Sequence, residues 1–449
     1  MMFGLNAQVE YSIQSLRNVY QASDYNPAYR STYSLSLGLP GISSIYGAVG
    51  NTGFNFSDVI TEELINGSHR LDVDRLAGNI SRKKNYLFAG AQVNLFHIQF
   101  QEKNNFWSFH SKVRTDTRFS YPKDLFVLAA DGNLGAGNQI DLSGLAFDQM
   151  SYIENALGYN KKVGDWVYGF KLKYLMGLTN IRTRKSDLTW DINQDDIYQY
   201  KFSGNYEVLT AGIPTIDTAG NTNEFDETWA KPQGNGLAID IGASYQIIPK
   251  LLLSASINDV GFIRWKKHTS SYKAQEDFEY DGIVVTIQSL EKGEISGPDT
   301  IDYNYEYTQG EKYTTSVRAN LNLSARYQLL KRLWADAVIN ISAYRGLRPG
   351  GSVGLYWEWK RFLNVSLSNT MSYGRMLNPA LGLVIKPGPL QFYIVTDNMA
   401  TLFAPLMVPK GLSAPLINPY KSKSFGIHVG MNLVFGRVKD QETLQSIVK

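Results

Sequence analysis

The sequence predicts an all-β protein: a transmembrane antiparallel β-barrel of about 14 strands, with a short N-terminal plug-like segment and long outer loops. Three features lead to this prediction. Apolar and polar residues alternate over long stretches. Short turns alternate with long polar connections, and aromatic residues recur beside the short turns. Membrane-spanning helices are not expected, because no stretch approaches about 18 uninterrupted apolar residues.

Composition narrows the class of protein. A length of 449 residues suits two or three soluble domains or one long barrel. With 44 Lys and Arg against 41 Asp and Glu, the net charge is only +3, which removes the electrostatic case for nucleic-acid binding. The chain has no cysteine, so disulfides, thiolate catalysis and cysteine-bound metals are excluded. Aromatic residues make up 13% of the chain, a content that suits a barrel with aromatic girdles.

Alternation with a period of two residues is the main evidence for strands. In residues 313–327 the odd positions are mainly apolar, as at Leu321, and the even positions are polar, as at Arg326. Such a run exceeds the usual strand of about 5–6 residues and covers the roughly 9–11 residues of a tilted membrane strand. The same pattern marks residues 166–176, 237–247, 363–373 and 425–435.

Short turns set the strand count. Six are expected, at 101–104, 160–165, 248–250, 329–332, 360–361 and 386–389. Their six hairpins supply twelve strands, and one strand near 31–51 and another at 424–435 bring the number to about 14, an even count that closes a barrel without edges. The other connections are long and polar. Aromatic residues near the short turns would form a girdle at one membrane interface: Tyr159, Tyr245, Tyr327, Trp357 and Trp359.

The chain is expected to divide into four parts. Residues 1–7 are interpreted as the remnant of a signal peptide cleaved near Ala7, which implies export. Residues 8–30 form an N-terminal plug or periplasmic segment, 31–435 the barrel, and 436–449 a polar periplasmic tail. Within the barrel, 179–236 and 266–311 are expected as long extracellular loops. A hairpin of 186–193 and 197–209 would project from the first of these loops, and 70–82 would form a short helix.

No enzymatic, cofactor or metal site is expected. The five histidines form no close pair of the kind that binds zinc, and His428 is interpreted as a polar wall residue. The stretch 191–196 starts like a calcium loop but lacks its glycine and its final glutamate. The glycines of 132–137 have the wrong spacing for a nucleotide loop. No nucleophile elbow is present.

The polar faces of the strands are the only functional surface that the pattern implies. In a membrane barrel they line the lumen, where they either border a watery path or hold a plug by ion pairs. Buried charges of both signs favour the second arrangement, because an isolated buried charge is costly. The lumen-facing candidates are Lys112, Arg114, Arg118, Lys171, Lys173, Asp240, Arg318, Arg326, Asp336 and Glu358.

Several sequence blocks carry a family resemblance. Asn26, Pro27 and Ala28 resemble the early Asn-Pro-Ala element of 14-stranded barrels related to the fatty-acid transporter family, which is shared by the PorV and PorP/SprF proteins of Bacteroidota type IX secretion and gliding. Blocks at 39–46, 154–159, 255–265 and 396–398 are similar to a Bacteroidota outer-membrane β-barrel family of unknown function. The resemblance implies a plug motif at Asn26–Ala28, a barrel and residence in the outer membrane. It implies no substrate.

Three functions remain open at this stage. The first is transport of small or hydrophobic solutes through a gated lumen. The second is a non-transporting scaffold or accessory barrel of a type IX secretion, gliding or envelope complex, which a filled lumen would favour. The third is a soluble secreted all-β binding protein. For the first two we expect the cell outer membrane as location, with outer-membrane lipid and lipopolysaccharide as partners. Acidic loop clusters near Glu224 and Glu276 are interpreted as charges kept for solvation, with a bridge to lipopolysaccharide through divalent cations as the alternative.

Overall fold

The computed structural model describes most of the chain. The described residues are 10–55, 60–65, 68–71, 73–80, 83–135, 139–192, 200–215, 231–280, 305–360, 362–372, 375–403 and 422–438. The expected signal remnant at 1–7, the acidic cluster near Glu224 and most of the tail at 436–449 lie outside these residues.

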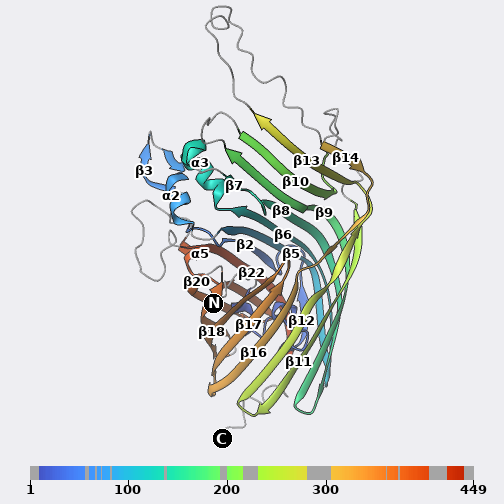
Figure 1. Cartoon of the computed structure of the whole chain (residues 1–449). Coiled ribbons are helices and arrows are strands. Elements are labelled where there is room, and N and C mark those ends of the chain that lie inside the picture. Colours follow the sequence, from blue (N-terminus) through green and yellow to red (C-terminus); the bar gives the residue numbers. More distant parts are fainter. Residues whose placement is uncertain are drawn as a thin grey trace, which may run out of the picture.

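The chain forms a closed barrel of fourteen antiparallel strand positions, which confirms the predicted fold class (Figure 1). Two positions are each filled by a broken strand, β1 with β2 and β15 with β16. In wall order the strands are β1 (Tyr33–Gly38) with β2 (Ile45–Asn51), β5 (Lys84–Glu102), β6 (Asn105–Pro122), β8 (Ala146–Val163), β9 (Trp166–Ile192), β11 (Gly234–Ile248), β12 (Leu251–Trp265), β15 (Tyr313–Ser316) with β16 (Ala319–Leu330), β17 (Leu333–Ala343), β18 (Leu347–Trp359), β19 (Leu363–Ser372), β20 (Arg375–Ile385), β21 (Leu390–Thr396) and β22 (Ser424–Arg437).

The first and last strands close the wall. β1 and β2 both pair with β22 on one side and with β5 on the other. Closure leaves no unpaired barrel edge, which is the condition for a sheet that spans a bilayer. All six expected short turns join consecutive wall strands at one end of the barrel, called here the turn end.

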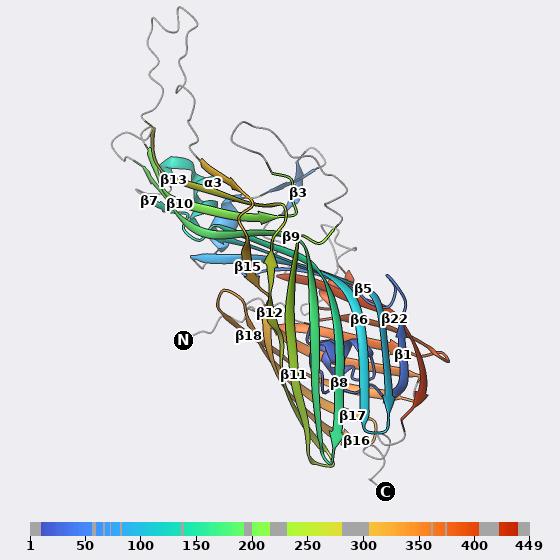
Figure 2. The same ribbon diagram turned by 90° about the vertical axis from the view of Figure 1, so that its right-hand side faces the viewer.

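The opposite end, the loop end, carries a sheet extension. β9 continues past the barrel to Ile192 and there pairs with β10 (Tyr200–Ala211), so the projecting hairpin is partly a continuation of a wall strand. β13 (Thr269–Tyr280) pairs with β10, and β14 (Tyr305–Gln309) pairs with β13. The ranges expected as the two long loops therefore hold these strands as well. Figure 2 shows the extension leaning away from the barrel axis.

Small elements complete the loop end and the interior. At the loop end are β3 (Ile60–Ile65), β4 (Ser68–Leu71), β7 (Gln139–Asp141), α2 (Val73–Asn79), α3 (Asp124–Gly135) and α5 (Ala400–Phe403). α2 lies where the short helix was expected. α1 (Ser12–Ser15) and the 3-10 turn η1 (Tyr20–Asp24) belong to the N-terminal segment. None of the helices in the described ranges is long and apolar enough to cross a membrane.

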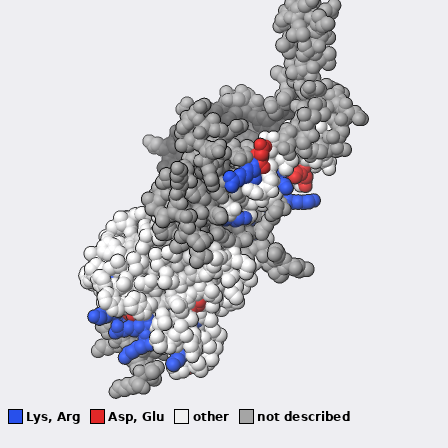
Figure 3. All heavy atoms as spheres, turned by 90° about the vertical axis from the view of Figure 1, so that its left-hand side faces the viewer, with Lys and Arg blue, Asp and Glu red and all other residues white. Residues whose placement is uncertain are grey.

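The outer face of the barrel is an apolar belt. Every wall position carries at least one exposed large apolar side chain, among them Leu172, Ile241 and Leu323. Aromatic rings gather at the turn end, where Trp166 stacks on Tyr245 with ring centroids 4.3 Å apart. In Figure 3 the middle of the barrel is almost free of charge, and Lys and Arg collect at the turn end. An apolar band of this extent suits lipid contact and not water.

Candidate functional site

The N-terminal segment, defined here as residues 10–30, lies inside the barrel (Figure 2). On one side its apolar residues Ile13, Leu16 and Val19 pack in a cluster with Trp334, Tyr356 and other side chains of β17 to β21. On the other side it meets polar residues of β6 to β12. The segment is therefore attached by apolar packing to one half of the wall and by hydrogen bonds and ion pairs to the other half.

The Asn-Pro-Ala motif makes the closest approach to the wall. Asn26 Oδ1 accepts the Ala28 N–H at 2.8 Å, which closes a local turn, and Asn160 Nδ2 of β8 donates to the Pro27 carbonyl at 3.0 Å. Two glycines make room for it. A Cβ at Gly242 would lie 2.2 Å from Asn26 Oδ1, and one at Gly169 would lie 2.3 Å from the Pro27 backbone. With Asn26 and Pro27 in place, a side chain at either position would push the motif away from the wall.

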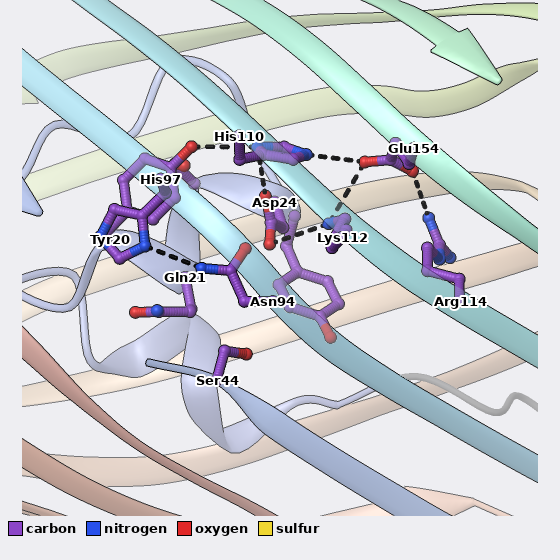
Figure 4. A network of polar contacts seen from close by, with 12 residues as sticks. Tyr20, Gln21, Asp24, Ser44, Asn94, His97, His110, Lys112, Arg114 and Glu154 are labelled. Carbon is purple, nitrogen blue, oxygen red and sulfur yellow. Dashed lines mark hydrogen bonds and ion pairs between the residues drawn. The ribbon is translucent and has the colours of Figure 1, made fainter. Parts of the chain in front are cut away.

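A buried network of charged groups joins the N-terminal segment to the wall, and Figure 4 shows the part of it around Asp24, Lys112 and Glu154. Strand alternation places His110, Lys112 and Arg114 on the inner face of β6, and neighbouring strands add the rest. Its four cations are Lys112, Arg114, Lys171 and Lys173, and its four carboxylates are Asp24, Glu154, Asp240 and Asp259. The four positive and four negative charges balance, which lowers the cost of burying them.

Asp24 connects the N-terminal segment to this network. Its carboxylate oxygens lie 3.1 Å from Lys112 Nζ and 3.1 Å from Lys171 Nζ. Burial alone would raise the pKa of Asp24, but these two ammonium groups outweigh burial and hold the pKa well below its usual range. Asp24 therefore stays ionised, and it is the carboxylate of the segment that binds the lysines of the wall.

Glu154 and Asp259 hold the wall side of the network. Glu154 of β8 accepts from Arg114 Nη1 at 2.9 Å and lies 3.2 Å from Lys112 Nζ. Asp259 sits at an irregularity where β12 pairs with β11, with a φ of 60°, a conformation that Asp tolerates better than most residues. The bulge turns its carboxylate inward, to 2.5 Å from Lys173 Nζ.

The other expected lumen residues lie in separate places. Arg326 and Asp336 form a two-point ion pair nearer the turn end, with Nε–Oδ1 of 2.7 Å. Arg318 lies 3.4 Å from Asp116 toward the loop end, and the buried Arg118 stacks on Tyr86. Glu358 pairs with Arg437 at 3.4 Å at the turn end. The sequence candidates thus do not form one cluster, although Lys112, Arg114, Lys171, Lys173 and Asp240 do.

The start of the segment is held at the loop-end side of the lumen. Asp397, just after β21, accepts the backbone N–H groups of Tyr11 at 2.7 Å and Ser12 at 2.8 Å. Burial raises the pKa of Asp397 to about 6. Glu10 Oε1 lies 2.8 Å from His428 Nδ1.

His428 also contacts a serine, but the arrangement does not form a hydrolase site. His428 Nε2 lies 2.7 Å from Ser44 Oγ, which gives a Ser-His-Glu chain with Glu10. Ser44 is only 1% exposed, and the Tyr393 hydroxyl also occupies the imidazole Nε2 at 3.2 Å. A substrate carbonyl cannot reach the serine, so these contacts anchor the segment. Within the described ranges no three His, Asp or Glu side chains gather to hold a metal ion.

The sequence candidates include all four cations of the network but only one of its four carboxylates, Asp240. Glu154 could have been found from the parity of its strand, because Tyr152, Glu154 and Ala156 all point inward. Asp259 could not, since the bulge changes its facing, and Asp24 lies in a segment without strand periodicity.

The comparison with protein families gives one match. Residues 27–397 match the model of the family of unknown function DUF5723. The chain belongs to this family. The DUF5723 match begins at Pro27, within the plug motif, and covers every wall strand except β22; residues 10–26 of the N-terminal segment precede it. No curated protein sequence matches the chain.

Solved structures share the barrel outline with this DUF5723 chain at low similarity. A Pseudomonas aeruginosa FadL homologue is 8% identical with a TM-score of 0.43, covering 96% of this chain and 99% of its own. The Pseudomonas putida toluene transporter TodX is 8% identical with a TM-score of 0.40, covering 92% and 93%. The Ralstonia pickettii toluene transporter TbuX is 8% identical with a TM-score of 0.33, covering 96% and 97%. These values are too low to transfer a solute or a mechanism.

Proposed function

We propose that this protein is an outer-membrane transport barrel in which the N-terminal segment gates the lumen for small or hydrophobic solutes. The closed wall and its apolar belt support membrane residence, and export through a signal peptide is part of the proposal. The solute is not specified by the contacts described above.

The observation that carries the proposal is the position of the segment between two hollows. Toward the turn end lies a cavity of about 220 Å³ lined by Arg17, Tyr29 and residues of the short turns. Toward the loop end lies a smaller one of about 70 Å³ beside Asp24 and Asp259. The segment therefore fills the lumen between the two cavities, and displacing it would join them.

The nature of the contacts supports a barrier that can move. Half of the attachment is ionic and hydrogen-bonded, and water can replace such contacts when the segment leaves. The network also remains partly paired without Asp24, because Lys112 keeps Glu154 at 3.2 Å. Some charges of the wall therefore stay paired when the segment leaves the lumen.

A second candidate is a scaffold barrel of a secretion, gliding or envelope complex. Two observations favour it: the segment fills the central lumen, and β9, β10, β13 and β14 extend the sheet beyond the barrel. Such an extension offers a surface for a protein partner. A role in type IX secretion and the binding of lipopolysaccharide are part of this second proposal.

Conductance of the purified barrel in a planar bilayer separates the two functions. A gated transporter is expected to show discrete openings that become more frequent when Asp24 is replaced by Asn. Asp187→Asn is the matched control, because Asp187 is 61% exposed and pairs only loosely with Lys185, at 3.7 Å. Silence of the wild type and of Asp24→Asn, with correct heat-modifiable folding, would favour the scaffold.

A further inference from the structure

The cavity at the turn end has a chemical character of its own. It has a volume of about 220 Å³ and lies between the N-terminal segment and the short turns. Seven of its lining residues are Lys or Arg, and two are Asp or Glu. Arg17 and Arg30 come from the segment, and lysines come from three different turns: Lys103, Lys162 and Lys250. Positive charge therefore surrounds the cavity from several sides.

Within the described residues, no carboxylate forms an ion pair with Arg17, the cation that the N-terminal segment places beside the aromatic lining of this cavity. Its Nε is buried without a hydrogen-bond partner, and its Nη2 reaches only the Tyr29 hydroxyl at 3.5 Å and Ser324 Oγ at 3.4 Å. In contrast, Arg326 pairs with Asp336 and Arg437 pairs with Glu358. A buried guanidinium N–H without an acceptor is costly, so an anion in the cavity that accepts from Arg17 would stabilise it.

Aromatic rings form the apolar part of the lining. The Arg17 guanidinium lies over the Tyr29 ring at 4.3 Å, and Trp334 and Tyr356 lie with ring centroids 5.5 Å apart. All three rings line the cavity. A ligand with an anionic group and a flat or apolar body would satisfy both parts of the lining.

We infer that this cavity binds the phosphate group of a small, water-soluble phosphate ester, with Arg17 as its main anchor. A phosphate dianion fits the excess of cations better than a carboxylate, because it carries more charge and accepts hydrogen bonds from several directions. A membrane lipid is not the expected source, because the cavity opens among the short turns inside the strand ring and not on the lipid-facing wall. This inference does not rest on the proposed transport, since binding is measurable in a closed barrel.

Isothermal titration of the full-length barrel in detergent at pH 8 tests the inference. The probes are inorganic phosphate, phenyl phosphate and acetate. We expect phenyl phosphate to bind more tightly than inorganic phosphate, and acetate to bind at least about tenfold more weakly than either. In Arg17→Gln the affinity for phenyl phosphate should fall by about tenfold, the scale of one charged hydrogen bond.

Two further variants control for folding and for general surface charge. Lys250→Gln at the exposed rim is expected to weaken phenyl phosphate binding by a smaller factor while the segment stays in place. Lys266→Gln removes an exposed charge at the far end of β12 and should leave binding unchanged. Absence of phosphate binding at millimolar concentration, equal binding of acetate, or equal losses in Arg17→Gln and Lys266→Gln would each overturn the inference.

Discussion

Replacing Asp24 by Asn should loosen the N-terminal segment by a predictable amount. The change removes the carboxylate that lies 3.1 Å from each of two lysine ammonium groups. Removing one partner of a buried ion pair typically costs about 3–5 kcal/mol. For Asp24→Asn we expect the seated position of the segment to lose about 2–3 kcal/mol, at or below the lower end of that range. The loss is limited because Asp24 is 16% exposed, Lys112 stays paired with Glu154, and Asn still accepts a hydrogen bond.

The equilibrium between seated and displaced segment follows from this value. Since about 1.4 kcal/mol changes an equilibrium constant tenfold, the displaced population should rise by roughly 30- to 140-fold. The barrel wall itself should stay folded, because the hydrogen bonds between its strands do not depend on Asp24.

Thiol labelling measures the displaced population directly. The chain has no cysteine, so Ala22→Cys, at a position that is 0% exposed in η1, introduces the only thiol. When the segment reseats faster than the reagent reacts, the labelling rate is proportional to the displaced population. The rate should rise by roughly 30- to 140-fold in Asp24→Asn and stay unchanged in the control Asp187→Asn. Equal rates in both backgrounds would refute the claim that Asp24 holds the segment.

Three more predictions use other parts of the molecule. Gly242→Ala should speed labelling of the Ala22→Cys reporter, because its Cβ would meet Asn26 Oδ1, while Gly47→Ala should not, because its Cβ meets nothing within 4 Å; the reverse order would contradict the close approach. Leu323→Arg, on the apolar belt, should lower the free energy of unfolding in bilayers by about 2–4 kcal/mol, whereas Leu330→Arg at the turn end of the same strand should cost about 0–1 kcal/mol, and equal costs would argue against lipid contact. Because burial raises the pKa of Asp397 to about 6 from an ordinary 3.8, its contribution to stability is fully present below pH 4 and is lost as pH rises through 6. The unfolding free energy of the wild type relative to Asp397→Asn should therefore fall over this window, and a flat or rising difference would contradict the raised pKa.

The wall of the barrel could be predicted from the sequence because its causes are local. Alternation of apolar and polar residues fixes which side chains face lipid, and the short turns fix which strands pair. All six hairpins and the strand count followed from these two patterns. The sequence predicts one strand near 31–51, whereas residues 39–44 interrupt it and divide it into β1 and β2. Both pieces pair with β22 and β5, so the break does not change the order of the strands.

The centre of the lumen could be predicted only in part because its causes are not local. Lys112 and Lys173 were found by parity, but their partners Asp24 and Asp259 depend on a segment without periodicity and on a bulge. The buried Nε of Arg17, which has no hydrogen-bond partner among the described residues, also follows from tertiary placement alone. Alternation along the sequence determines whether a strand residue faces the lumen or the lipid. The members of a charge cluster depend in addition on the register of several strands and on the path of the N-terminal segment.

A reversible lock between segment and wall tests the gate most directly. A Cβ at Gly242 would lie 3.1 Å from Asn26 Cγ, the atom that a cysteine sulphur would replace, so Asn26→Cys with Gly242→Cys should form a disulfide. Ser244→Cys with Ser254→Cys is the matched control, since these hydroxyls lie 2.9 Å apart on two wall strands.

Solute flux and bilayer conductance are measured before and after reduction of each pair. We predict that the oxidised Asn26–Gly242 lock abolishes flux, that reduction restores it, and that the wall pair conducts equally in both states. Flux that persists through the oxidised lock would show that solutes pass without movement of the N-terminal segment, and would contradict the proposed gate.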